Sequence, residues 1–231
     1  MLVQLKPHHE AFYRFVFDKL VRLNALILCE GKTEVEVVKK IAEKLRISLQ
    51  DFSVDVTDCE GIEVVPQMTS AILTLARLSR KLKVMVVIID AEDMNIEDRI
   101  RSFADSLRAR GAQMGVQVSN PSPIDDQVYS VKVIVENRTL AMVIAINGVF
   151  TLPFQGHKLE DHAVKLLLLS GKMSDEDLER YKDSKEVIER DRIVELIEDS
   201  NEEYVKCAFN HIHLALLKLL SILRSGIISN H

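Results

Sequence analysis

The hydrophobic residues of this chain fall into short continuous runs, each followed by a stretch with helical spacing. Residues 25–29 form an apolar run that ends at an acid and a glycine, a pattern typical of a strand buried on both faces. From Thr33 to Leu45, apolar residues recur every three or four positions, which predicts a helix directly after that strand. Residues 83–90 are the most hydrophobic short run and predict a central strand.

The same alternation continues between and after these elements. Residues 52–58 alternate polar and apolar side chains and predict a second, less buried strand, while residues 64–82 have helical spacing. A helix is predicted over 96–110, with Gly111 as its stop signal. Three strand–helix units in a row predict a mainly parallel sheet with right-handed crossovers.

The second half of the chain has a different pattern. Residues 112–127 are rich in Gly, Ser, Pro and Asp and predict a surface loop. Two β-rich runs follow, separated by Asn-Arg-Thr, and they fit a hairpin or two neighbouring strands. Helices are then predicted over 159–170, 174–199 and 202–224.

These elements predict an α/β fold with a mainly parallel central sheet flanked by helices. We expect one α/β domain over residues 1–170, with a core of about 24–165, and a helical C-terminal extension over 171–231 packed on the same domain. The predicted last helix has a wide apolar surface, so it is either buried in the domain or the contact surface of a homo-oligomer.

Composition narrows the classes of partner and compartment. The 231 residues carry a formal net charge of -5, so nucleic acid could be held only by local patches or bridging metal ions. Three cysteines without Cys-x-x-Cys spacing indicate neither a disulfide framework nor a zinc site. The first 20 residues lack a leader pattern and no apolar run approaches the length of a spanning helix, so we expect a cytoplasmic protein without membrane contact.

The letters Gly31-Lys32-Thr33 resemble the end of a nucleotide-binding P-loop, but the spacing is wrong. A P-loop needs a first glycine five residues earlier, because several successive backbone N–H groups wrap the phosphates. That position is Leu26, inside the predicted strand. The loop is therefore too short to hold a triphosphate. The dinucleotide-binding pattern Gly-x-Gly-x-x-Gly does not follow any predicted strand.

Acidic residues at two strand ends indicate a different chemistry. Glu30 follows the first strand and Asp90 ends the strand 83–90, so both face one crevice if the two strands are neighbours. In an extended backbone Asp90 and Glu92 point the same way, Asp93 adds an acid from the turn, and Glu34 lies in the first turn of the next helix. Converging carboxylates repel one another, and a hard cation such as Mg²⁺ or Mn²⁺ would relieve that repulsion.

Each of these features also has a purely structural interpretation. Glu-Gly after a strand is often only a turn, and Glu160 and Asp161 could equally be the first-turn acids of a helix. His211 and His213 lie on different sides of a predicted helix, so we interpret them as surface or partly buried histidines rather than as a metal pair. Lys32, on the loop after Glu30, could contact a phosphate.

Two segments resemble a known family. The segment "LILCEGKTEVEVVKKIAEKL", from Leu26, resembles the first motif of Toprim domains, an apolar strand followed by Glu-Gly and a helix with a second acid. "VVIIDAED" is similar to their second motif, a strand ending in Asp-x-Asp, and the match is nearest to OLD-like nucleases and stand-alone Toprim proteins. A later Leu-Glu-Asp segment at 159–161 fits the same pattern.

The resemblance implies roles for individual residues. Glu30 would be a general acid/base or a metal ligand, Asp90 and Glu92 would hold a metal ion, and Glu34 with Glu160 would complete a second metal site. Glu92 departs from the usual aspartate. We therefore expect Mg²⁺- or Mn²⁺-dependent phosphodiester chemistry on nucleic acid, DNA or RNA. The alternative is a non-catalytic Toprim-like module that binds a metal or a protein and regulates it.

Overall fold

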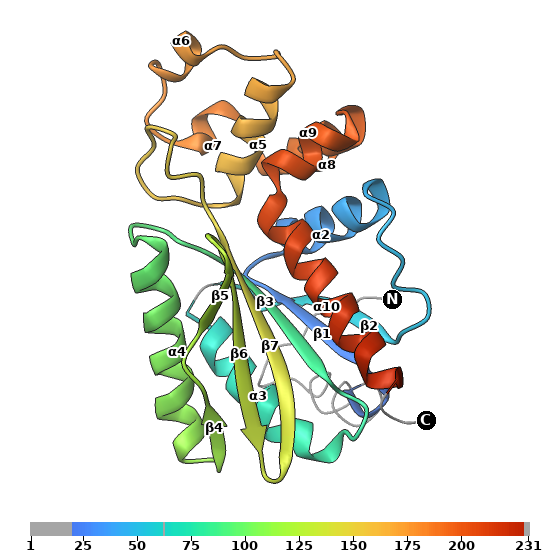
Figure 1. Cartoon of the computed structure of the whole chain (residues 1–231). Helices are drawn as coiled ribbons and strands as arrows, with labels where there is room; N and C mark the ends of the chain where they lie inside the picture. Colours follow the sequence, from blue (N-terminus) through green and yellow to red (C-terminus); the bar gives the residue numbers. More distant parts are fainter. Residues whose placement is uncertain (1–19, 62, 229–231) are drawn as a thin grey trace.

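The computed structural model describes residues 20–61 and 63–228 (Figure 1). Residues 1–19, for which no leader pattern was expected, lie outside the described residues. In chain order the elements are η2 (Leu20–Arg22), β1 (Ala25–Cys29), α2 (Lys32–Lys44), β2 (Val54–Asp58), α3 (Val65–Leu75), η3 (Ala76–Leu78), β3 (Val84–Asp90), α4 (Ile96–Ala112), β4 (Val116–Val118), β5 (Ser122–Asp125), β6 (Val128–Val135), β7 (Arg138–Asn147), α5 (Leu159–Leu169), α6 (Asp175–Leu178), α7 (Ser184–Val187), α8 (Arg190–Asp199), α9 (Glu202–Ala208) and α10 (Asn210–Ile228).

One sheet forms the centre of the molecule, with the strand order β2-β1-β3-β7-β6-β4 and with β5 also paired to β6. Strands β2, β1, β3 and β7 run parallel to one another, whereas β6 is antiparallel to β7, β4 and β5. The predicted α/β fold with a mainly parallel central sheet flanked by helices is therefore confirmed. The hairpin alternative for the two β-rich runs is also confirmed, as the whole of β6 pairs antiparallel with residues 138–145 of β7.

Helices cover both faces of the sheet, which explains the continuous apolar runs. Every residue of β1 and β3 is buried. Alternate residues of these strands point to opposite faces and enter two separate hydrophobic clusters. Helices α3 and α4 pack on one face, and α2 and α10 pack on the other (Figure 1).

The C-terminal helices fall into two groups. Helices α5 to α9 lie beyond the carboxyl ends of the parallel strands, at the top of Figure 1, and α10 then returns along the sheet. Ile212, Leu216 and Leu219 of α10 are fully buried in the same cluster as Ile27 and Val86 of the sheet. The apolar surface of α10 is thus largely used inside the chain, although Leu217 stays 42% exposed.

Three predicted segments differ from the structure. The predicted surface loop 112–127 contains β4 and β5, short strands held by backbone bonds to β6, and β5 has no buried residue that could mark it as a strand. The predicted helix 174–199 is three helices, because Ser174 and Asp183 cap new starts within it. The predicted helix 202–224 bends by 92° between α9 and α10.

The described helices are too short or too polar to span a membrane singly. No single helix among residues 20–61 and 63–228 combines the length and apolar character needed to cross a membrane. The bent pair α9 and α10 meets these two criteria only when both helices are counted together.

Candidate functional site

The parallel pairing of β1 and β3 brings two strand ends together. Cys29, the last residue of β1, pairs with Ile88, so Glu30 emerges level with the end of β3. On the other side of β3, Asp90 pairs with Asn147 at the end of β7. The first strand and the strand 83–90 are neighbours, so the condition set for a shared crevice is met, and three polar residues meet at one edge of the sheet.

Three carboxylates converge at this edge. Glu30, Asp90 and Glu92 each offer one oxygen, and the three oxygens lie within 4.8 Å of one another. Glu30 Oε2 also accepts a hydrogen bond from the backbone N–H of Asp90, with 3.2 Å between the two atoms. Asp90 is buried, Glu30 is partly buried and Glu92 is exposed, so the cluster opens to solvent on the Glu92 side. We call Glu30, Asp90 and Glu92 the acidic cluster.

Glu92 reaches the cluster by a different route from the predicted one. The side chains of Asp90 and Glu92 converge as predicted, but the predicted extended backbone is wrong, because β3 ends at Asp90 and Glu92 has a φ of 57°, in the left-handed region. The Glu92 and His157 backbones hold each other through two N–H···O bonds of 2.8 Å. This isolated bridge between distant segments places Glu92 beside the other two acids.

Burial and mutual repulsion disfavour the charged forms of Glu30 and Asp90. Burial raises the pKa of Glu30 to about 7, and the charges of Glu34 and Glu92 add to that shift. Burial raises the pKa of Asp90 well above its ordinary value, and the charge of Glu30 acts in the same direction. Arg99 opposes the shift of Glu30 from the neighbouring helix α4, while burial lowers the pKa of Arg99 itself.

The acidic cluster fits a hard divalent cation. None of the ion pairs formed within residues 20–61 and 63–228 includes Glu30, Asp90 or Glu92. Positive charges act on these acids only through space: Arg99 on all three, Arg190 on Asp90 and Lys158 on Glu92. Carboxylate oxygens are the ligands that Mg²⁺ and Mn²⁺ prefer.

Glu34 and Glu160 lie around a different positive charge. Both are buried, and Arg190 Nε donates to Glu160 Oε1 across 2.6 Å. Burial alone would lower the pKa of Arg190, but the hydrogen bond and charge of Glu160, with the charge of Glu34, raise it. Glu34 folds back over Gly31, where a Cβ atom would lie only 2.9 Å from Glu34 Oε2. Arg190 thus provides a positive charge beside these two acids, while Glu34 Oε2 and Glu160 Oε2 are buried without a hydrogen-bond partner among the described residues.

The remaining predicted site residues lie around the edge of the cluster. Asp161 is buried and its Oδ2 accepts from Val149 N at 3.2 Å and contacts His157 Nδ1 at 2.9 Å. Asp93 is exposed and lines an open hollow of about 430 Å³ together with Glu92. Lys32 is the exposed first residue of α2.

Sequence patterns gave no prediction for a buried polar chain behind Asp90. Asn147 Nδ2 donates to Asp90 Oδ1 at 2.8 Å, and His211 Nε2 lies 2.7 Å from Asn147 Oδ1. The interpretation of His211 as a surface or partly buried residue is wrong, because it is 1% exposed, under the bend before α10. The sequence did contain one indication of Asn147. This polar residue stands at the end of an apolar run and directly before a glycine, as Glu30 does.

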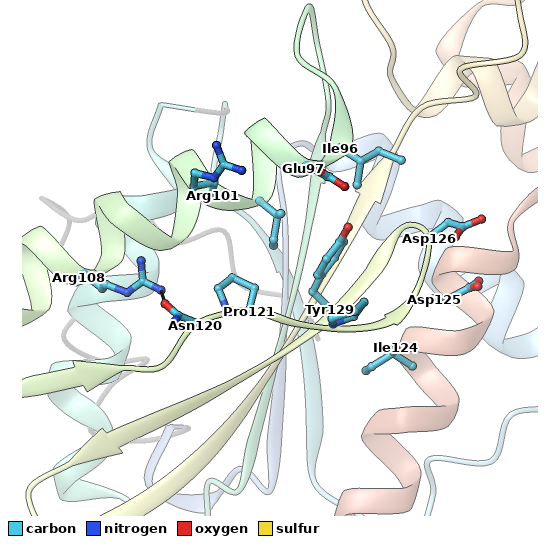
Figure 2. Close-up of a pocket in the computed structure, with 12 residues that line it drawn as sticks. Ile96, Glu97, Arg101, Arg108, Asn120, Pro121, Ile124, Asp125, Asp126 and Tyr129 are labelled. Carbon is cyan, nitrogen blue, oxygen red and sulfur yellow. Dashed lines mark hydrogen bonds between the residues drawn. The ribbon is translucent and has the colours of Figure 1, made fainter.

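A wider hollow lies away from the acidic cluster. It measures about 860 Å³ and lies between α4 and the strand β5. Figure 2 shows Arg101 and Arg108 on α4, with Arg108 beside Asn120 and with Pro121 and Tyr129 below the helix. Arg108 is already engaged by Asn120 Oδ1 at 2.7 Å. None of the acids considered above lines this hollow.

Comparisons with known proteins give a family and some solved structures. The C-terminal region of the Burkholderia pseudomallei OLD protein is similar over 87% of this chain and 98% of its own, with 13% identity and a TM-score of 0.42. The C-terminal region of the Xanthomonas campestris pv. campestris OLD protein is similar over 90% of this chain and 98% of its own, with 14% identity and a TM-score of 0.45. No curated protein matches the chain. The profile of one family matches residues 24–197, more than half of the sequence, and the chain belongs to that family, described as "Protein of unknown function (DUF3226)".

Proposed function

We propose that this protein holds Mg²⁺ or Mn²⁺ at the acidic cluster and hydrolyses phosphodiester bonds in nucleic acid. The observation that carries the proposal is the convergence of Glu30, Asp90 and Glu92 oxygens within 4.8 Å at the carboxyl end of a parallel sheet. Ligands of open α/β sheets bind at this edge. The sequence resemblance of the same two strand ends to Toprim motifs supports the choice of reaction.

The three acids differ in what they can contribute. Asp90 is fixed, because its Oδ1 accepts hydrogen bonds from Asn147 Nδ2 and from the N–H of Leu159. Glu30 Oε2 accepts a hydrogen bond from the Asp90 backbone, and the Glu30 side chain is only partly buried. Glu30 can therefore hold the cation or exchange a proton with a reacting water. Glu92 is the exposed member, on the side from which a substrate would approach.

A bound divalent cation would supply a Lewis acid for phosphate oxygens and a means of activating water. The chain's own residues also offer two positive charges near this edge. Arg99 acts on the cluster through space, and Lys32 is exposed at the start of α2. Because the chain has a net charge of -5, binding of a nucleic-acid backbone would depend on these local charges and on the cation.

A regulatory module that binds metal without catalysis is the second candidate. It is favoured by the arrangement of the other acids, because Glu160 is paired with Arg190 and Asp161 with His157. Glu160, one of the two acids that would serve a second metal ion, is therefore already engaged. The proposal accordingly assigns one cation to the acidic cluster, and the rival differs from it only in whether cleavage follows binding.

The test compares the unaltered chain with Glu30→Gln. Mn²⁺ binding is measured by calorimetry, and cleavage is measured on single-stranded and duplex DNA and RNA with Mg²⁺ or Mn²⁺. We expect cleavage by the unaltered chain and a loss of about 100-fold or more in Glu30→Gln, because a ligand or proton-transfer group is lost. Glu36→Gln is the matched control, since Glu36 is exposed on α2, the helix that follows Glu30, and its ion pair among the described residues is with Lys39.

The outcomes separate the two candidates. Cleavage that is equal in Glu30→Gln and the unaltered chain would overturn the assignment of the site. Mn²⁺ binding that depends on Glu30 without any cleavage would favour the regulatory module. Absence of Mn²⁺ binding at millimolar concentration would overturn both.

A further inference from the structure

A buried chain of hydrogen bonds connects α10 to the acidic cluster. His211, the second residue of α10, contacts Asn147 Oδ1 through its Nε2 at 2.7 Å. Asn147 Nδ2 in turn donates to Asp90 Oδ1 at 2.8 Å. All three side chains are at most 1% exposed, so water does not compete for these contacts. This series of hydrogen bonds leads from the last helix, α10, to the central strand β3.

The chemistry of the groups fixes the direction of every bond. Asp90 Oδ1 also accepts from Leu159 N–H at 3.2 Å, so it acts as an acceptor towards Asn147. Asn147 must then present Nδ2 to Asp90 and its carbonyl Oδ1 to His211. His211 therefore donates through a protonated Nε2, and its Nδ1, which has no partner among the described residues, is unprotonated.

A second histidine supports this neutral state. His162 stacks on His211 with 4.0 Å between the ring centroids. His162 donates from Nδ1 to Ala208 O at 2.8 Å and accepts at Nε2 from Gly148 N–H at 2.9 Å, so it is neutral as well. Burial lowers the pKa of both histidines, to about 3 for His162 and well below the ordinary value for His211. Two stacked neutral rings therefore stand behind Asn147.

We infer that His211 is a positioning residue for the metal site: it orients Asn147, whose amide holds the Asp90 carboxylate with Oδ1 bound and leaves Oδ2 to face the cation. This inference rests on the proposed function, because it assigns a task to a residue behind a proposed ligand. Groups behind a metal ligand fix its orientation and typically change metal affinity by about 10- to 100-fold when removed. Helix α10 would thus be part of the site although it contributes no ligand.

The test uses Mn²⁺ affinity measured by calorimetry on the full chain. His211→Leu removes the donor, and we expect affinity to fall by about 10-fold or more. His211→Gln keeps an N–H donor near the same place and should recover most of that loss. His213→Leu is the matched control on the same helix, because His213 makes no contact with Asn147 among the described side-chain hydrogen bonds, and it should leave affinity unchanged.

A double-mutant cycle distinguishes positioning from a general structural role. If His211 acts through Asn147, His211→Leu should have no further effect on affinity in an Asn147→Ala background. Additive losses, or an affinity that follows only the folded fraction seen by circular dichroism, would overturn the inference. So would unchanged affinity in His211→Leu.

A metal-free measurement keeps this inference separate from the proposed function. Ring ¹⁵N shifts of His211 should report a neutral ring protonated at Nε2, and Asn147→Ala should perturb that signal while Glu36→Gln should not. If the unaltered chain shows this signal but binds no Mn²⁺, the proposed function fails, and so does the role of His211 in holding a cation. If it binds Mn²⁺ but the signal is absent, only the inference about His211 fails.

Discussion

The carboxylate of Glu30 accepts a hydrogen bond from the backbone N–H of Asp90, with 3.2 Å between Oε2 and N. These residues are 60 positions apart and belong to the ends of two neighbouring strands. The bond fixes one acid against the backbone of the other, so the two carboxylates are held together despite their repulsion. Without a bound cation, the repulsion between the two carboxylates lowers the free energy of unfolding by an amount that depends on pH.

We predict that Glu30 makes the metal-free protein less stable at high pH than a Glu30→Gln variant. The folded pKa of Glu30 is about 7, above its ordinary value of 4.5, so the folded state binds the proton more tightly between these values. Relative to the variant, the free energy of unfolding should therefore rise as pH falls from 8 to 5. We expect a relative gain of about 1–3 kcal/mol, reduced by the partial exposure of Glu30.

Urea unfolding with a chelator present, at pH 8 and pH 5, measures this difference. The charges of Glu34 and Glu92 and the opposing charge of Arg99 act on Glu30, and Asp90 shifts in the same direction as Glu30. The charges of Glu34 and Glu92 and the shift of Asp90 increase the predicted rise in the free energy of unfolding as pH falls, whereas the charge of Arg99 reduces it. A difference between the two proteins that does not change with pH, or that moves the other way, would show that Glu30 is charged in the folded state across this range.

Arg190→Ala should destabilise the fold far more than Arg192→Ala. Glu160 is fully buried and depends on Arg190 for its charge partner, whereas the pair Arg192–Glu195 is exposed on both sides. Removing Arg190 leaves a buried carboxylate unpaired, which costs about 2–4 kcal/mol, while the loss of an exposed pair costs about 0–1 kcal/mol. Denaturant unfolding of the two variants measures both costs. Equal losses would show that the Glu160 pair contributes no more than a surface pair.

Gly148→Ala should be more damaging than Gly171→Ala. Both glycines have positive φ, but a Cβ at Gly148 would lie 2.6 Å from the Cβ of His157, whereas the space around Gly171 is open. Backbone strain alone gives a cost of about 1–2 kcal/mol at Gly171, and the clash should bring Gly148→Ala to about 2–4 kcal/mol. The comparison is made by thermal unfolding. Equivalent effects would mean that the segment of His157 moves freely away from Gly148.

The pattern of hydrophobic residues was sufficient to predict the core strands and helices of this protein, because its central strands are buried on both faces. The continuous apolar runs at 25–29 and 83–90 and the helical spacings after them predicted β1, β3, α2 and α4 close to their observed positions. Glu30 and Asp90 could be chosen as candidate site residues because each is an acid at the end of one of these apolar runs. Parallel strands place such ends at one edge of a sheet, so their proximity followed from sequence once the strands were taken as neighbours.

Tertiary structure decided everything that depends on contacts between distant segments. The placement of Glu92 results from its left-handed backbone and its bridge to His157, whereas strand alternation alone gave the wrong geometry. The pairing of Glu160 with Arg190 crosses 30 positions, and the bonds from His211 to Asn147 cross 64. Strand and helix periodicity records which face of an element is buried, but a buried polar contact between two elements leaves no period in either one.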